Sequence, residues 1–225
     1  MKIGLLACDH IQGDYPDYSE LFNAILPQYS LEVFNVCDGF FPKSASDFDA
    51  WVITGSRLSV YDEIDWIKKL KAFVREIYDA DKHCIGVCFG HQILGEAMGG
   101  KVVKSAKGWC VGVHEFEILE REDWMNPYYP RVNLLMSCQD QIKVLPKNSK
   151  VLAKSSKCPV GIIKIGEKML GIQGHPEFSA SYVRSLIEDR TNSLGEKTAK
   201  EGIESLKVPF QSKEIAEWIS NFLNQ

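Results

Sequence analysis

Residues 83–97 place one cysteine in a pattern that suits nucleophilic chemistry. In a nucleophile elbow, the nucleophile occupies a strained strand-to-helix turn, and small residues two positions away on each side let strand and helix approach. Gly86 and Gly90 supply those small residues around Cys88, which follows an apolar run and precedes a helical pattern. We predict that Cys88 lies at a helix N-terminus, where the dipole lowers the pKa of a thiol and the N–H of Phe89 can face an oxyanion. On this segment alone, a buried cysteine in a glycine-rich turn is an equally good interpretation.

A second segment, Gly-His-Pro-Glu at residues 174–177, pairs an imidazole with a carboxylate. Pro176 disfavours helix at the residue before it and favours an extended backbone there. An extended backbone places His175 and Glu177 on one face, so the carboxylate can accept a hydrogen bond from one ring nitrogen while the other stays free. With Cys88, these residues supply a nucleophile, a base and an orienting acid. The alternative, a loop histidine beside a solvated acid, becomes less convincing once the elbow is present.

A third segment, Thr-Gly-Ser at residues 54–56, ends an apolar run. Glycine at a strand end lets the backbone present an N–H closely to a ligand. We predict that Gly55 is a second oxyanion donor. A plain turn glycine is nearly as good an interpretation.

The elements that must position these residues alternate between strand and helix. Apolar residues at helical spacing predict a helix over 66–77 with one buried face. This alternation predicts right-handed crossovers and a parallel sheet, whereas the strand-rich stretch 110–173 predicts antiparallel additions. We therefore expect one α/β domain over residues 1–225, with three layers and a mostly parallel central sheet flanked by helices. Strands are predicted at 3–8, 31–36, 51–54, 83–87, 134–136, 151–153 and 169–173, and further helices at 179–190, 196–206 and 212–223.

Charge and composition exclude several classes of protein. The 26 Lys and Arg residues stand against 30 Asp and Glu, a formal charge of −4, and the chain has no long basic run. Nucleic acid and anionic membrane are therefore not expected partners. The first apolar run ends at Asp9, too early for a signal peptide or a membrane span. The seven cysteines form no Cys-x-x-Cys pair, so we expect reduced thiols, a cytoplasmic location and no zinc site.

The three chemical segments resemble those of the class I glutamine amidotransferases. They are Gly-Val-Cys-Phe-Gly-His-Gln around Cys88, the strand end at Gly55, and Gly-His-Pro-Glu, and the resemblance extends over essentially the whole chain. It implies a flavodoxin-like fold and a catalytic triad of Cys88 as nucleophile, His175 as base and acid, and Glu177 as orienting acid. It also implies an oxyanion hole made by the N–H groups of Gly55 and Phe89.

The same resemblance suggests where the substrate binds. Gln92, four residues after the cysteine, matches a residue that lines the glutamine pocket. The stretches around Gly108 and Trp109, and around Ser137 and Cys138, resemble two segments whose backbone holds the α-amino and α-carboxylate groups of the substrate. Many relatives carry histidine directly before the Gln-Asp pair, where this chain has Cys138. We therefore expect the amino-acid end of the pocket to differ.

Two branches of the family are similar to this chain. One contains GMP synthetase and similar enzymes, whose glutaminase passes ammonia to a synthetase. The other contains stand-alone γ-glutamyl peptidases, which cleave a γ-glutamyl amide in a peptide. Resemblance to either branch implies a cysteine-dependent amidohydrolase that acts through a Cys88 thioester. Its substrate would be a small γ-glutamyl compound, glutamine or a peptide, and a synthetase in trans is the other candidate partner. The tail after Glu177 is too short for an ATP-binding synthetase domain.

No cofactor is expected, because the chain contains neither a P-loop nor a Gly-x-Gly-x-x-Gly motif. Two alternatives stay open. One is a non-catalytic or synthetase-coupled subunit of the same fold that binds and regulates a partner. The other is an intracellular peptidase or chaperone of a related fold, in which the acid comes from elsewhere than His-Pro-Glu.

Overall fold

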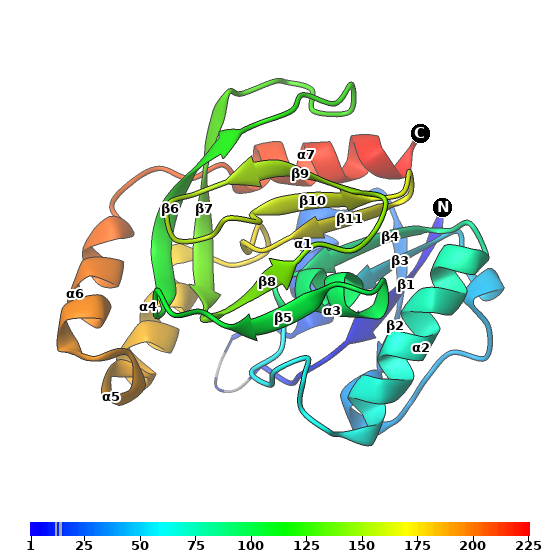
Figure 1. The fold of residues 1–225 in the computed structure, drawn as a ribbon, viewed down its shortest axis with the longest axis horizontal. Helices are drawn as coiled ribbons and strands as arrows, with labels where there is room; N and C mark the ends of the chain where they lie inside the picture. Colours follow the sequence, from blue (N-terminus) through cyan, green and yellow to red (C-terminus); the bar gives the residue numbers. More distant parts are fainter. Residues whose placement is uncertain (12, 14) are drawn as a thin grey trace.

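A nine-stranded mixed sheet runs through the centre of this computed structural model, which describes residues 1–11, 13 and 15–225 (Figure 1). Its strands lie in the order β2-β1-β3-β4-β11-β10-β9-β6-β7, and β5 and β8 form a separate antiparallel pair. The bounds are β1 Lys2–Ala7, β2 Ser30–Asn35, β3 Ala50–Ile53, β4 His83–Val87, β5 Lys101–Lys104, β6 Cys110–Ile118, β7 Arg131–Cys138, β8 Asp140–Val144, β9 Ser149–Lys154, β10 Ile162–Ile165 and β11 Met169–Ile172.

Five neighbouring strands, β2, β1, β3, β4 and β11, are parallel. Strands β3 and β11 are buried along their whole length, as expected where helices cover both faces of a sheet. Strands β10, β9, β6 and β7 extend this sheet with antiparallel pairing. The predicted fold class is confirmed, including the antiparallel additions, and the order 2-1-3-4 followed by β11 is the flavodoxin-like order.

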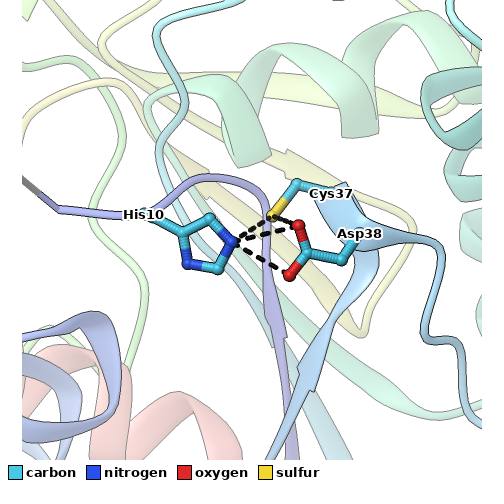
Figure 2. Close-up of side chains that lie close together, drawn as sticks. All are labelled: His10, Cys37 and Asp38. Atoms are coloured by element: carbon cyan, nitrogen blue, oxygen red, sulfur yellow. Dashed lines mark hydrogen bonds and ion pairs between the residues drawn. The ribbon is translucent and has the colours of Figure 1, made fainter.

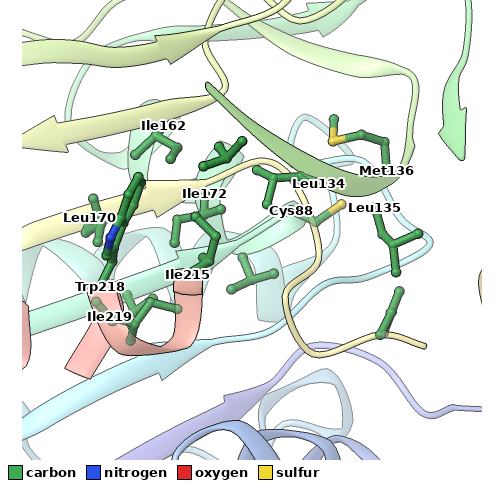
Figure 3. Packing of buried hydrophobic residues seen from close by; sticks show 14 of the residues in the cluster. Cys88, Leu134, Leu135, Met136, Ile162, Leu170, Ile172, Ile215, Trp218 and Ile219 are labelled. Carbon is green, nitrogen blue, oxygen red and sulfur yellow. The ribbon is translucent and has the colours of Figure 1, made fainter. Parts of the chain in front are cut away.

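Helices cover the sheet from both sides and complete three layers (Figure 1). On one side, α2 and α3 bury Leu70 and Ile93 against the sheet. On the other side, α1, α4 and α7 bury Phe22, Ile187 and Trp218 in the cluster that also contains Cys88. Figure 3 shows Trp218 and Cys88 within this cluster. Among the described residues, no helix combines the length and the apolar character needed to cross a membrane. The bounds are α1 Tyr18–Ile25, α2 Asp65–Asp79, α3 Phe89–Ala97, α4 Ala180–Asp189, α5 Thr191–Leu194, α6 Glu196–Ser205 and α7 Ser212–Leu223, with 3-10 helices at Val36–Asp38 and Ala45–Asp47.

Helix α3 packs on β11 through a fully buried histidine, His91. A Cβ on Gly171 of β11 would lie 2.7 Å from the His91 Nδ1, so glycine makes room for the ring. The ring faces the backbone of Gly171 and Val160, but within the described part of the chain neither nitrogen has a hydrogen bond of normal geometry. Burial lowers the pKa of His91 to about 4, so the ring is neutral at pH 7.

This neutral ring should make the fold sensitive to acid. An unfolded histidine binds a proton below about pH 6.5, whereas folded His91 does so only near pH 4. Between these values the unfolded state binds more protons than the folded state. The free energy of unfolding should therefore decrease as the pH is lowered, by up to about 1.4 kcal/mol per pH unit from this group. Urea unfolding measured at pH 7 and at pH 5 should show a smaller loss of the free energy of unfolding for His91→Leu than for wild type. An equal loss in both would contradict the assignment, and exposed His10→Gln is the control.

Candidate active site

Cys88 occupies the turn between β4 and α3 with a backbone that non-glycine residues rarely adopt. Its φ is 53° and its ψ is −101°. Close backbone contacts hold this turn: a Cβ on Gly86 would lie 2.3 Å from the Gly90 carbonyl oxygen, and a Cβ on Gly90 would lie 2.2 Å from that of Ile53. The predicted strand-to-helix turn is therefore present, with glycines where the sequence pattern requires them.

His175 follows β11, the direct neighbour of β4. Its N–H donates to the Leu135 carbonyl at 2.8 Å, and its ring stacks on Phe178 with ring centres 4.0 Å apart. Its Nδ1 lies 2.8 Å from the Glu177 Oε1. Both side chains are buried. The imidazole is thus held by its backbone, by a stacked ring and by a carboxylate.

The Glu177 carboxylate contacts the His175 ring. A Cβ on Gly55 would lie within 3.8 Å of both the His175 Cε1 and the Cys88 Cβ, so the cysteine is a near neighbour of that ring. Burial opposes a charge on the imidazole, but the Glu177 carboxylate and then the Cys88 sulfur outweigh it and raise the pKa of His175 to about 10. The Glu177 Oε2 has no hydrogen-bond partner among the described residues, so the polar contact of this carboxylate is to His175 through Oε1. The structure pairs the predicted histidine with the predicted glutamate and places the predicted cysteine in the wall of the same cavity as the histidine, and their action as a triad stays a prediction.

The two predicted oxyanion donors both lie next to Cys88. Gly55 follows β3, and a Cβ there would lie 3.2 Å from the His175 Cε1 and 3.8 Å from the Cys88 Cβ. Phe89 is the first residue of α3, whose first-turn N–H groups have no partner within the helix. Position therefore allows both N–H groups to serve an oxyanion, and their role stays a prediction.

Sequence reasoning missed Tyr18, whose hydroxyl also reaches this place. A Cβ on Gly55 would lie 3.2 Å from the Tyr18 Oη. Burial, followed by the charge of Glu177, raises the pKa of Tyr18 well above its usual value, so the hydroxyl keeps its proton. The only signal in the sequence is the spacing of Tyr18 and Phe22 on one helix face, which indicates core packing rather than a site.

Two cavities meet at Cys88. The larger, of about 460 Å³, extends over α1 and α4 and is lined by aromatic side chains. Tyr15 and Tyr182 have ring centres 4.7 Å apart, Tyr182 and Phe178 4.6 Å, and Phe178 stacks on His175. An aromatic row, Tyr15, Tyr182 and Phe178, therefore leads from His175 along the larger cavity. No sequence pattern indicates this row, since helix packing brings its members together.

The smaller cavity, of about 210 Å³, contains most of the predicted substrate residues. Gln92, Trp109, Ser137 and Cys138 line it, whereas Gly108 is not among its lining residues. The Gln92 Nε2 donates to the Asp140 carbonyl at 2.9 Å and to the Gln173 Oε1 at 3.1 Å. The Cys138 sulfur accepts from the Gln141 Nε2 at 3.6 Å. Substrate contacts by these residues remain predictions.

Arg190, which sequence reasoning also missed, lines both cavities. It caps the C-terminus of α4, and its Nη1 lies 3.4 Å from the Ser137 Oγ. This places a guanidinium beside the predicted substrate residues, where it could pair with a carboxylate.

Comparisons with known proteins show which proteins this chain is similar to. The family model described as glutamine amidotransferase class-I matches residues 28–191. Gamma-glutamyl peptidase 4 of Arabidopsis thaliana is 33% identical over 183 residues, which are 77% of this chain and 73% of that protein. The glutamine-hydrolyzing GMP synthase subunit of Methanothermobacter thermautotrophicus is 39% identical over 94 residues, 41% of this chain and 50% of that one. A crystal structure of a glutamine amidotransferase from Thermotoga maritima superposes with a TM-score of 0.77 at 18% identity, covering 99% of this chain and 96% of that one.

The close approach at Gly90 should make any side chain there costly. A methyl group would meet the backbone oxygen of Ile53, which cannot move without disturbing β3, so Gly90→Ala should lower the free energy of unfolding by about 3 kcal/mol. Gly95→Ala in the same helix is the control, because its methyl would meet the side chain of Ile142 rather than backbone, and alanine favours helix. Urea unfolding of both variants measures the difference, and equal stabilities would contradict the role of Gly90.

Glu177 should be required for the charge on His175. Glu177→Gln keeps the size of the side chain and removes its charge, so NMR titration of the imidazole should give a pKa of His175 below the wild-type value of about 10. A folded pKa above the unfolded 6.5 stabilises the fold fully below pH 6.5 and loses this contribution as pH rises through about 10. The variant should therefore be less stable than wild type at pH 7, with a smaller difference above pH 10.

An exposed carboxylate provides the control for this titration. Glu115→Gln removes a surface partner of Arg131 and should leave the His175 titration unchanged. A pKa of His175 that stays the same in Glu177→Gln would show that the carboxylate does not hold the charge.

Proposed function

This chain belongs to the glutamine amidotransferase class-I family, and from that we propose that it hydrolyses a γ-glutamyl amide through a thioester on Cys88. The observation that carries the proposal is the hydrogen-bonded pair of His175 and Glu177 beside Cys88, at the meeting point of two cavities. Such an arrangement supplies a nucleophile, a proton carrier and a group that orients it.

In the proposed first half-reaction, the Cys88 thiolate attacks the side-chain carbonyl carbon of the γ-glutamyl group. A carbon–sulfur bond forms, and the carbonyl oxygen becomes an oxyanion that the N–H groups of Gly55 and Phe89 stabilise, each by about 3 to 4 kcal/mol in the transition state. His175, which is protonated at pH 7, gives its proton to the amine nitrogen as the carbon–nitrogen bond breaks. The amine leaves, and a γ-glutamyl thioester remains on Cys88.

In the second half-reaction, neutral His175 takes a proton from water, which attacks the thioester carbon. The carbon–sulfur bond breaks, the glutamate product leaves, and the thiolate and imidazolium are restored. Glu177 stabilises the imidazolium in both halves and keeps the ring in one orientation through its contact with Nδ1.

The volumes and lining residues of the two cavities support a leaving amine larger than ammonia. The smaller cavity is polar and contains Gln92 and Ser137, which suits the γ-glutamyl group, and Arg190 could pair with its α-carboxylate. The larger cavity has the volume of a typical ligand pocket, and the aromatic row beside His175 offers apolar contact that ammonia cannot use. The proposed substrate is thus a γ-glutamyl peptide, in line with the relatives named gamma-glutamyl peptidases.

A second function is favoured by one comparison. The match to the glutamine-hydrolyzing subunits of GMP synthase supports a role in which glutamine is the substrate and a synthetase in trans uses the ammonia. The proposed chemistry at Cys88 is the same in both cases. The two functions differ in the preferred leaving group and in the effect of a partner.

Substrate preference tests the proposal. The kcat/KM for a γ-glutamyl dipeptide should exceed that for glutamine by more than tenfold, and Tyr182→Ala should lower the value for the dipeptide more than that for glutamine. Cys88→Ala should abolish both activities, whereas Cys158→Ala, which removes a buried thiol outside the two cavities, should retain them. These rates and the folding of each variant by circular dichroism are the measurements.

Each other outcome has a distinct meaning. Turnover by Cys88→Ala would refute the nucleophile. A preference for glutamine that cell extract increases would favour the synthetase-coupled function. Absence of turnover, together with failure of a glutamine-like alkylating agent to label Cys88, would favour a non-catalytic subunit that binds a partner.

A further inference from the structure

Three side chains that metals use as ligands gather outside the proposed catalytic residues, beyond the ends of β1 and β2 (Figure 2). The two strands are parallel neighbours whose pairing ends at Ala7 and Asn35. His10 and Asp38 each lie three residues past this last pair, and Cys37 precedes Asp38 in the 3-10 helix. Parallel strands deliver the residues that follow them to one edge of a sheet, so His10 and Cys37 meet although 27 positions separate them.

The three side chains converge on one point. The His10 Nε2 lies 3.1 and 3.0 Å from the two oxygens of Asp38 and 3.7 Å from the Cys37 sulfur (Figure 2). The Cys37 sulfur lies 3.9 Å from the Asp38 Oδ1. With ordinary zinc bond lengths, the edges of a tetrahedron would be about 3.4 Å from nitrogen to oxygen and about 3.6 Å from sulfur to either. The observed triangle matches these edges to within about 0.3 Å.

We propose that His10, Cys37 and Asp38 form a binding site for a divalent zinc-class cation. Three protein ligands leave the fourth tetrahedral position to water. On binding, the S–H bond of Cys37 breaks, a sulfur–zinc bond forms, and the proton passes to the solvent. The donor set of imidazole, thiolate and carboxylate suits zinc better than magnesium or calcium, which prefer oxygen ligands alone.

Among the described residues, the surroundings leave this triangle open to an ion. Asp9, the nearest other carboxylate along the chain, is occupied by Arg57, whose Nη2 and Nε lie 2.7 and 2.9 Å from its two oxygens. The His10 and Asp38 side chains are 58% and 41% exposed, so a cation can reach them without unfolding. The sequence predicted no zinc site because its cysteines and histidines lack ligand spacing, and spacing along the chain cannot reveal ligands from two strand ends.

A bound ion would link the wall of the larger cavity to the segment that follows β2. His10 also lines the larger cavity that contains Cys88, and its carbonyl accepts from the Arg57 Nη2 at 3.2 Å. A cation would therefore join the wall of this cavity, beyond β1, to the segment beyond β2. This inference does not depend on the proposed hydrolysis.

Cobalt, which replaces zinc in tetrahedral sites and absorbs light when bound to thiolate, provides the test. The whole chain is used with Cys88→Ser, which removes the thiol that lines both cavities. We expect one equivalent of Co²⁺ to produce a thiolate-to-cobalt absorption band that added Zn²⁺ removes. Adding Cys37→Ser should abolish the band, and adding His10→Gln or Asp38→Asn should weaken Co²⁺ binding at least tenfold.

Thermal unfolding provides a second measurement and a control. Zn²⁺ should raise the Tm of Cys88→Ser but not that of the variant that also carries Cys37→Ser, because only a ligand that prefers the folded state stabilises it. Glu32→Gln, on the exposed edge strand β2 and paired with Lys2, should leave the cobalt band unchanged. The site is refuted if one equivalent of Co²⁺ gives no thiolate band, or if the band survives Cys37→Ser, in which case His10 and Asp38 form only an ion pair.

Discussion

The close approach of β4 and α3 is the constraint on which the rest of the site depends. Gly86 and Gly90 touch across the turn, and Cys88 between them takes a positive φ that costs on the order of 1–3 kcal/mol. Pairing of β4 with β3 and β11 in the middle of the sheet, and burial of α3, offset that cost. Because both neighbours are parallel to β4, they bring Gly55 and His175 to the edge where Cys88 emerges.

Two buried histidines show how the partners of a ring decide its charge. Among the described residues no acid lies beside His91, and burial lowers its pKa to about 4. His175 is also buried, yet Glu177 and Cys88 raise its pKa to about 10. Burial alone would leave a neutral ring in both places. The positive charge on His175 that the proposed chemistry needs therefore comes from Glu177 and Cys88 beside the ring, and not from burial.

Sequence predicted those features that are coded locally. The expected apolar runs are strands, the last helix has the predicted bounds Ser212–Leu223, and the turn around Cys88 is present because its glycines are adjacent in sequence. Strands β5, β6, β8 and β10 were not individually predicted. Strands β5 and β8 are short, partly exposed and pair outside the main sheet, whereas charged residues interrupt the apolar runs of β6 and β10. Tyr18, Tyr182 and Arg190 were missed because they come from α1 and from α4 and its C-terminal cap, whose residues reach the site only through packing between distant segments.

Because β4 pairs directly with β11, the strands that carry Cys88 and His175 are separate from the stretch of chain that lines the smaller cavity. Cys88 and His175 follow adjacent strands, although more than eighty residues of sequence lie between them. That intervening stretch leaves the parallel sheet, forms β5 to β10, and returns carrying Trp109, Ser137 and Cys138 to the wall of the smaller cavity. Insertions or substitutions within this stretch can change the lining of the smaller cavity, the proposed substrate pocket, while the two strands that carry Cys88 and His175 keep their register. Substrate selectivity could therefore change during evolution without a change in the proposed catalytic residues.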